Sequence, residues 1–281
     1  MKKAGDYLLP ICKVLGYLGV YLAANVISVV ACTVIMIFVT HSIDIYAGQE
    51  EVTSQLMKQA AFMTFVGNTL FVAAIILFAA IRKCSFKKEF YINAVPGKKI
   101  ILILLLGIAL NFFVSNFMHI LELSWPAFSR SMETYEQKAA LISESPFIVS
   151  LLLSVVSAPI TEELLLRCCI FTTLNKAYPA VLSVILTSVI FGLLHGNLIW
   201  STYAAVFGIV LNVLFIRFNS LIASISMHFA FNIIGSCVPT TFDVSFPVQI
   251  IFTILLGIIS AALFIIVMKK NLKSEIQPAN A

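Results

Sequence analysis

The residues best suited to chemistry are two adjacent glutamates in an otherwise apolar segment, Glu162 and Glu163. Burying a carboxylate among apolar side chains is costly unless the charge is paired. Glu163 and Arg167 are four residues apart, which is the spacing of an ion pair on one face of a helix. Glu162 is turned by about 100° from Glu163 and has no such partner in its own helix. Glu162 is therefore the stronger candidate for acid–base chemistry, whereas Glu163 and Arg167 also fit a structural pair.

Two histidines and an asparagine supply further polar groups in the following apolar segments. His195 ends the sequence Phe-Gly-Leu-Leu-His, and His228 and Asn232 are four residues apart. An imidazole can act as a general acid or base or as a metal ligand, and an amide can donate hydrogen bonds. A single histidine in a helix is also commonly a packed residue, and an asparagine in a membrane helix often joins two helices. Their occurrence in successive segments together with Glu162 favours one shared site.

The composition identifies the segments that carry these residues as membrane helices. Of 281 residues, 60% are hydrophobic and 11% are charged, whereas about a quarter of a soluble domain is charged. A helix needs about 20 apolar residues to cross a bilayer, and a segment inside hydrocarbon must be helical. We therefore expect an all-α, polytopic transmembrane bundle of about eight helices. The eight apolar stretches are residues 14–40, 59–81, 100–120, 147–170, 180–199, 201–216, 220–238 and 248–268.

The fourth of these helices has a proline just before its acidic pair. We expect this helix to run from Phe147 to about Asn175, which places Glu162 and Glu163 near its middle. Pro159 has no backbone N–H, so the carbonyl of Val155 loses its helical donor and a kink is favoured there. An opened helix at this point could admit water to the glutamates.

The basic residues predict the orientation of the chain. If the N-terminus is cytoplasmic, all of the 18 lysines and arginines except Lys58, Arg130 and Lys138 fall in inner segments. This bias follows the positive-inside rule, and an even number of passes places both termini in the cytoplasm. The net charge of +5 is then charge that anchors the chain at the membrane surface and does not indicate nucleic-acid binding.

Three motifs in the second half of the chain resemble those of a known family. Glu162-Glu163-Leu-Leu-Leu-Arg167, Phe191-Gly-Leu-Leu-His195 and His228-Phe-Ala-Phe-Asn232 match EExxxR, FxxxH and HxxxN in order. These are motifs of the CPBP intramembrane proteases, which include CAAX proteases and bacteriocin-processing enzymes and are also called the Abi family. One departure is Cys168, where the family often has glycine.

The resemblance divides the chain into three expected parts. Residues 147–238 would form the CAAX-protease-like catalytic core. Residues 1–146 would hold the first three membrane helices and their loops, and residues 239–281 the last membrane helix and a cytoplasmic tail.

The resemblance implies hydrolysis of a peptide bond within the membrane. Glu162 and His195 would activate the attacking water. His228 and Asn232 would stabilise the oxyanion, and Glu163 with Arg167 would orient the site. We predict catalysis by glutamate without a cofactor. The alternative is a metalloprotease, in which Glu162, His195 and His228 would bind a divalent metal such as zinc, although the HExxH spacing of soluble zinc peptidases is absent.

The expected partner is a membrane-associated protein or peptide substrate, in the plasma membrane if the source is bacterial. Two other functions fit the same residues. A buried glutamate and histidines also mark ion pathways in transporters, but the matching broken helices of transporter repeats are not seen. A non-catalytic immunity or scaffold protein of the same fold would keep its partner binding without Glu162.

Overall fold

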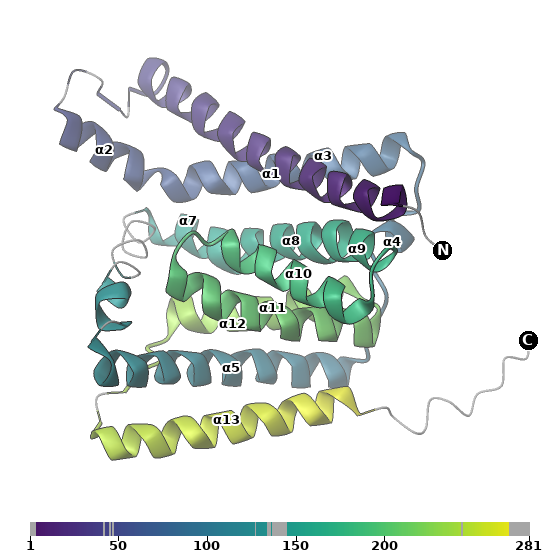
Figure 1. The fold of residues 1–281 in the computed structure, drawn as a ribbon. Coiled ribbons are helices and arrows are strands. Elements are labelled where there is room, and N and C mark those ends of the chain that lie inside the picture. The colour runs from purple at the N-terminus through teal and green to yellow at the C-terminus, as the bar shows by residue number, and fades with distance from the viewer. Residues whose placement is uncertain are drawn as a thin grey trace, which may run out of the picture.

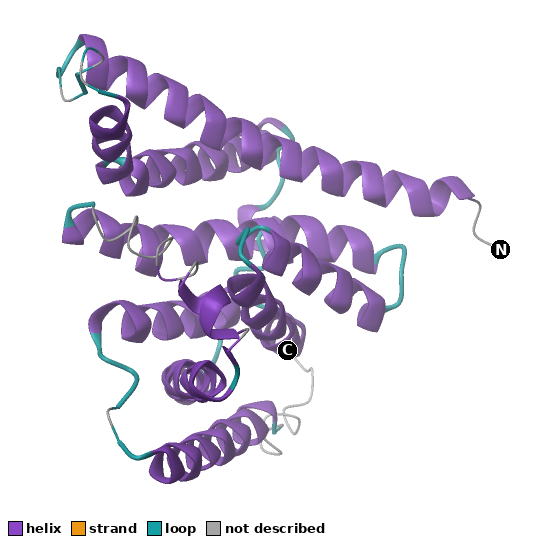
Figure 2. Ribbon diagram, turned by 60° about the vertical axis from the view of Figure 1, so that its left-hand side comes forward, coloured by secondary structure: helices purple, strands orange, loops and turns teal. Residues whose placement is uncertain are grey.

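The computed structural model describes residues 4–269, apart from residues 42, 45, 47, 127, 134, 135, 137–144 and 243. Throughout these residues the regular structure is helical and no strand occurs, which confirms the all-α prediction (Figure 2). Lys138 and the predicted tail from residue 270 onward lie outside the described residues.

Each of the eight predicted apolar stretches contains a helix. The fourth is one composite helix, Phe147–Asn175, in which short α-helical segments alternate with π-helical turns. Additional short helices, among them α2 and α4, lie in connections that the sequence left unassigned. The helices are α1 (Ala4–Phe38), α2 (Gln49–Lys58), α3 (Ala60–Ile81), α4 (Phe86–Glu89), α5 (Gly97–Ser124), α7 (Phe147–Leu151), α8 (Ala158–Glu163), α9 (Thr172–Asn175), α10 (Ala180–Leu193), α11 (Leu198–Phe218), α12 (Leu221–Cys237) and α13 (Phe246–Met268).

Six helices in the described part of the chain are long and apolar enough to cross a membrane. They are α1, α3, α5, the composite helix, α11 and α13. Their outward faces carry large exposed aliphatic side chains such as Ile251, Ile254 and Ile258 of α13. A soluble protein would leave few such residues in one continuous surface, so this chain is a multi-pass integral membrane protein. The two other apolar helices, α10 and α12, are shorter, and the number of eight passes stays a prediction.

The predicted end of the fifth apolar helix, 180–199, is wrong. Helix α10 stops at Leu193, and a tight turn leads into α11, whose first residue is Leu198. Gly196 adopts a left-handed conformation with φ of 63°, which glycine adopts without steric cost. The side chain of Asn197 then caps α11 by accepting hydrogen bonds from the backbone of its first turn, as is usual for asparagine at this position. His195 therefore lies in a turn rather than in a membrane helix.

The helices stack in layers that enclose the composite helix (Figure 1). The α1–α3 hairpin forms one outer layer and packs against the composite helix, while α13 forms the opposite outer layer against α5. Helix α12 lies between the composite helix and α5, and α10 and α11 pack against each other and against the composite helix (Figure 1). The composite helix and α11 are the most enclosed of the long helices, with 44% of their most apolar stretch buried. The residues with candidate chemistry thus lie at the centre of the bundle.

Candidate active site

The composite helix changes its hydrogen-bonding pattern on both sides of the two glutamates. A π-helical segment, Leu152–Ser157, precedes α8, and a second one, Leu164–Phe171, follows it. A π turn joins a carbonyl to the N–H five residues later, so the helix can continue past Pro159, which has no N–H to donate. The chain accommodates the proline in this way, and Glu162 and Glu163 lie in the last turn of α8.

Glu163 and Arg167 form the ion pair that their spacing indicates. Arg167 Nε lies 3.0 Å from Glu163 Oε2, and both side chains have no exposed surface. The two atoms form an ion pair, but the N–H of Nε is not aligned with Oε2 as in a hydrogen bond. Arg167 also donates from Nη2 to the carbonyl of Gly208 in α11, at 3.3 Å, and its guanidinium carbon lies 5.4 Å from the centre of the Phe191 ring. Pairing at this depth matters because a single buried charge would be strongly destabilising.

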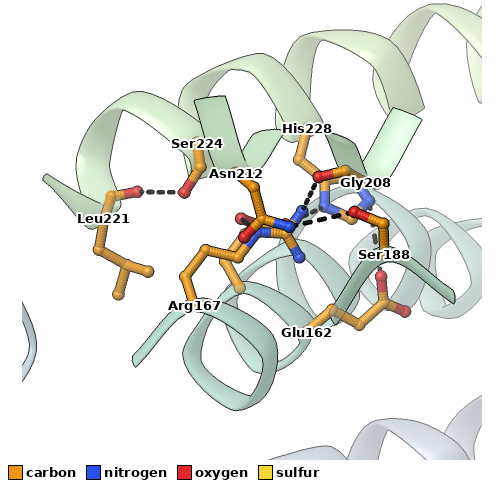
Figure 3. Close-up of polar contacts among 9 residues, drawn as sticks. Glu162, Arg167, Ser188, Gly208, Asn212, Leu221, Ser224 and His228 are labelled. Carbon is orange, nitrogen blue, oxygen red and sulfur yellow. Dashed lines mark hydrogen bonds and ion pairs between the residues drawn. The ribbon is translucent and has the colours of Figure 1, made fainter. Parts of the chain in front are cut away.

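His228 of α12 joins the two adjacent carboxylates. Its Nδ1 lies 3.1 Å from Glu163 Oε1, within hydrogen-bonding distance, and its Nε2 lies 3.6 Å from Glu162 Oε2. The rings of Phe191 and Phe207 pack edge-on against this imidazole, at centroid distances of 5.9 and 5.4 Å. Figure 3 shows the imidazole of His228 facing the carboxylate of Glu162. One buried carboxylate therefore orients the imidazole, whose other nitrogen faces the second carboxylate.

The two glutamates differ in their access to the surroundings. The side chain of Glu162 is 21% exposed, whereas that of Glu163 is fully buried. The separation of 3.6 Å between Glu162 and His228 is longer than an N–H···O hydrogen bond. Glu162 is thus the member of the cluster that a water molecule or a peptide could reach.

His195 lies beside this cluster without a direct contact to its carboxylates among the described interactions. Its Nδ1 lies 2.8 Å from the carbonyl of Phe191, so an N–H at Nδ1 donates there and leaves Nε2 as an acceptor in the neutral imidazole. The Phe191 ring contacts both imidazoles, at 5.0 Å from His195 and 5.9 Å from His228. The structure therefore places His228, rather than His195, next to Glu162.

Asn232 lies one turn beyond His228 on the same face of α12. Its amide nitrogen donates to the carbonyl of Ser154 at 2.7 Å. Ser154 belongs to the first π-helical segment, so this bond fastens α12 to the composite helix just before the glutamates. An amide nitrogen carries two N–H groups, and one of them suffices for this contact.

The three residues considered as metal ligands, Glu162, His195 and His228, do not form one cluster. Among the residues that the structure describes, no group of three or more His, Cys, Asp or Glu side chains is arranged so that it could hold a metal ion. A catalytic zinc needs about three protein ligands, and His195 is separated from Glu162 and His228 by its position in the turn after α10. These three side chains therefore do not fit a metal site.

Sequence reasoning did not identify the α11 side of this cluster. Gly208 provides the carbonyl that Arg167 binds, and a Cβ at this glycine would lie 3.0 Å from the Phe191 ring. Phe207 packs against His228. A glycine inside a long apolar helix is a sign of close helix packing, and Gly208 could have been singled out on that ground.

The sequence comparison agrees with this part of the structure. Residues 144–234 match the family described as Rce1-like, Type II CAAX prenyl endopeptidase Rce1-like. The match covers about a third of the chain and includes all of the candidate site residues. Comparisons with curated proteins and with solved structures gave no match. Residues 144–234 therefore match the domain of the Rce1-like CAAX prenyl endopeptidases, which belongs to the CPBP or Abi family.

Proposed function

We propose that this protein is an intramembrane endopeptidase that hydrolyses a peptide bond in a membrane-associated protein or peptide. The observation that carries the proposal is the contact of one buried imidazole, His228, with two adjacent carboxylates, one of them paired with Arg167. Such a cluster is expensive to bury in a membrane protein and marks a functional site. The match of this segment to a family of CAAX prenyl endopeptidases supports the same reaction class.

In the proposed mechanism Glu162 accepts a proton from water while the water oxygen attacks the scissile carbonyl carbon. His195 assists through its free Nε2. When the tetrahedral intermediate collapses, the C–N bond breaks and the leaving amine takes the proton from Glu162. General acid–base catalysis of this kind contributes typically about 10²–10⁴-fold in rate.

His228 and Asn232 are proposed to stabilise the oxyanion of the intermediate. Donors aimed at a developing oxyanion contribute about 10²–10³-fold each in a site that excludes water. The contact of His228 Nδ1 with Glu163 Oε1 fixes the direction of the imidazole, much as a buried carboxylate orients the histidine of a serine protease. Arg167 compensates the charge of Glu163 and keeps that carboxylate in place.

We also propose that all eight apolar helices cross the membrane and that both termini are cytoplasmic. The chain direction alternates from each of these helices to the next (Figure 1). Lys99 at the start of α5 donates to three carbonyls at the end of α13, and Arg217 at the end of α11 donates to Met268. These basic residues meet at one end of the bundle, as the positive-inside rule expects of the cytoplasmic side. Residues 147–238 would then be the catalytic core, between a support formed by 1–146 and the last helix in 239–281.

The test compares the wild-type protein in nanodiscs with two single variants. Glu162→Gln removes the proposed base and preserves side-chain size. Glu122→Gln is the matched control, because Glu122 also contacts a histidine, with its Oε2 3.4 Å from His119 Nδ1, but lies in α5. Each protein is incubated with tagged membrane peptides, both farnesylated at a C-terminal cysteine and unmodified, and the products are identified by mass spectrometry.

We expect cleavage by the wild-type protein and by Glu122→Gln and none by Glu162→Gln. Cleavage of only the farnesylated peptides would identify a prenylated substrate. Cleavage that survives in Glu162→Gln would contradict the proposed mechanism. A non-catalytic scaffold would cleave no peptide and would bind its partner equally well in all three forms.

A further inference from the structure

Asn212 of α11 is a fully buried amide near the candidate site to which the reaction gives no role. Its side chain has no exposed surface, and its Nδ2 donates to Ser188 Oγ of α10 at 3.2 Å. Its Oδ1 is buried and makes no hydrogen bond to the described residues. A buried amide oxygen without a donor is unfavourable and needs an explanation. A buried donor that also has no partner could satisfy this oxygen.

Arg167 supplies such a donor. Its Nη1 is also buried without a hydrogen-bond partner among the described residues, although Nε pairs with Glu163 and Nη2 donates to Gly208. In an α-helix the Gly208 carbonyl accepts the N–H of the residue four positions later, which is Asn212. The guanidinium of Arg167 therefore ends at the turn of α11 that carries Asn212, and the two side chains project into the same region (Figure 3).

The packing of α10 against α11 fixes the direction of the Asn212 amide. A Cβ on Gly208 would lie 3.3 Å from the Cα of Ser188, so the two helices are in close contact at this point. Ser188 is 2% exposed and receives the N–H of Asn212 from across this contact. Because the amide nitrogen of Asn212 is held by Ser188, the amide oxygen points away from Ser188. The guanidinium of Arg167, which contacts the same turn of α11, can only donate hydrogen bonds and is therefore a suitable partner for this oxygen.

We propose that Asn212 is a positioning residue: its Oδ1 accepts a hydrogen bond from Arg167 Nη1, directly or across one water molecule. The guanidinium is then held at three nitrogens, by Glu163, by the Gly208 carbonyl and by Asn212. Because Glu163 orients His228, Asn212 acts on the reaction through Arg167 and Glu163. The effect on catalysis rests on the proposed function, whereas the contact itself does not.

The contact can be measured without any substrate. The chain has four arginines, Arg82, Arg130, Arg167 and Arg217, so ¹⁵N-arginine labelling in nanodiscs gives few guanidinium signals. Arg167→Lys identifies the signal of Arg167 by its loss. In the wild-type protein we expect hindered rotation and slow hydrogen exchange at the Arg167 Nη groups.

A set of variants separates the acceptor oxygen from packing. Asn212→Leu removes the acceptor, and we expect exchange at Arg167 to become about tenfold faster or more, since a hydrogen bond to a charged group is lost. Asn212→Asp keeps an acceptor and should retain the slow exchange, whereas Ser188→Ala keeps Oδ1 but releases the amide nitrogen and should have a smaller effect than Asn212→Leu. Asn116→Leu, at a buried asparagine of α5, is the control. Asn212→Ala replaces the leucine variant if that variant does not fold.

The proposal is overturned if the Arg167 signals are the same in Asn212→Leu and the wild type. It is also overturned if Ser188→Ala has the full effect, because packing between α10 and α11 would then be the cause. In the peptidase assay, kcat of Asn212→Leu should fall about tenfold, as for one lost hydrogen bond to a charged group, with KM unchanged. A wild-type protein without peptidase activity would contradict the proposed function, and the arginine signals would still decide the contact.

Discussion

Two buried polar regions of this bundle differ in the kind of groups they contain. Around Asn116 and Gln249, where the end of α5 meets the start of α13, the groups are neutral: Asn116 Nδ2 donates to the carbonyls of Phe112 and Thr240, and Gln249 Nε2 donates to Asn116 Oδ1 at 2.6 Å. Within the residues 144–234 the groups are ionisable: Glu162, Glu163, Arg167 and His228. Both regions lie inside an apolar bundle, yet the second carries a far larger cost of burial.

The difference supports the proposal that one region stabilises the bundle and the other carries out the chemistry. The amide side chains of the α5–α13 region bond mainly to backbone carbonyls and to one another, and so join helices, as polar residues commonly do in membrane proteins. Both carboxylates contact one imidazole, that of His228, and one of them, Glu162, keeps an exposed surface. A purely structural cluster would have no reason to leave a carboxylate partly accessible next to a buried histidine.

The largest effect is expected at Glu162. Glu162→Gln should lower kcat by about 10²–10⁴-fold, because the proposed general base is lost, while the melting temperature in nanodiscs stays close to that of the wild type. The side chain is partly exposed and its contact with His228 is longer than a hydrogen bond, so folding depends little on it. Steady-state kinetics and thermal unfolding measure the two quantities. A residual kcat within tenfold of the wild type would contradict the assignment of Glu162 as the base.

The next effect concerns the stability of the ionisable region. Arg167→Met leaves Glu163 buried without its cation and should lower the free energy of unfolding by about 3–5 kcal/mol. The double variant Glu163→Gln/Arg167→Met removes both charges and should recover most of that loss, without recovering peptide cleavage. Unfolding in mixed micelles titrated with a denaturing detergent measures the stabilities. If the double variant is as unstable as Arg167→Met, then charge pairing is not what stabilises this region.

A smaller effect is expected in the amide region. Asn116→Leu should lower the free energy of unfolding by about 1 kcal/mol, the typical contribution of a polar contact between membrane helices, and should leave kcat within twofold of the wild type. Gln249 then loses its acceptor, so adding Gln249→Leu should restore part of the stability. The same unfolding and peptidase assays apply. A loss of kcat in Asn116→Leu as large as in Glu162→Gln would remove the distinction between the two regions.

Metal removal is expected to have the smallest effect. Because Glu162, His195 and His228 do not form a group that could hold a metal ion, prolonged dialysis against a zinc chelator should leave the rate of cleavage within twofold. Elemental analysis of the dialysed protein verifies that no stoichiometric metal is retained. A rate that falls on chelation and returns on addition of zinc would favour the metalloprotease alternative.

Much of the fold could be predicted from local properties of the sequence. Hydrophobic runs of sufficient length identify membrane helices, because no water is present inside the bilayer and a helix pairs its own backbone N–H and C=O groups. The prediction that one helix runs from Phe147 to about Asn175 is confirmed. The end of the fifth helix was not predictable in this way, because Leu193 and Leu194 are as apolar as the residues before them. The turn depends on Gly196 and on the capping side chain of Asn197.

In the candidate site, contacts within one helix were likewise predictable from the sequence, whereas contacts between helices were not. The pairing of Glu163 with Arg167 followed from the sequence alone, since residues four apart on one helix are neighbours whatever surrounds them. That His228 lies against both glutamates, and that Phe191 stands between His228 and His195, depended on how separate helices pack. Spacing along a chain carries no information on distances between helices, because these depend on crossing positions and on close contacts such as that at Gly208. The tertiary structure therefore decided which imidazole faces Glu162, and it placed Arg167 against the turn of α11 that runs from Gly208 to Asn212.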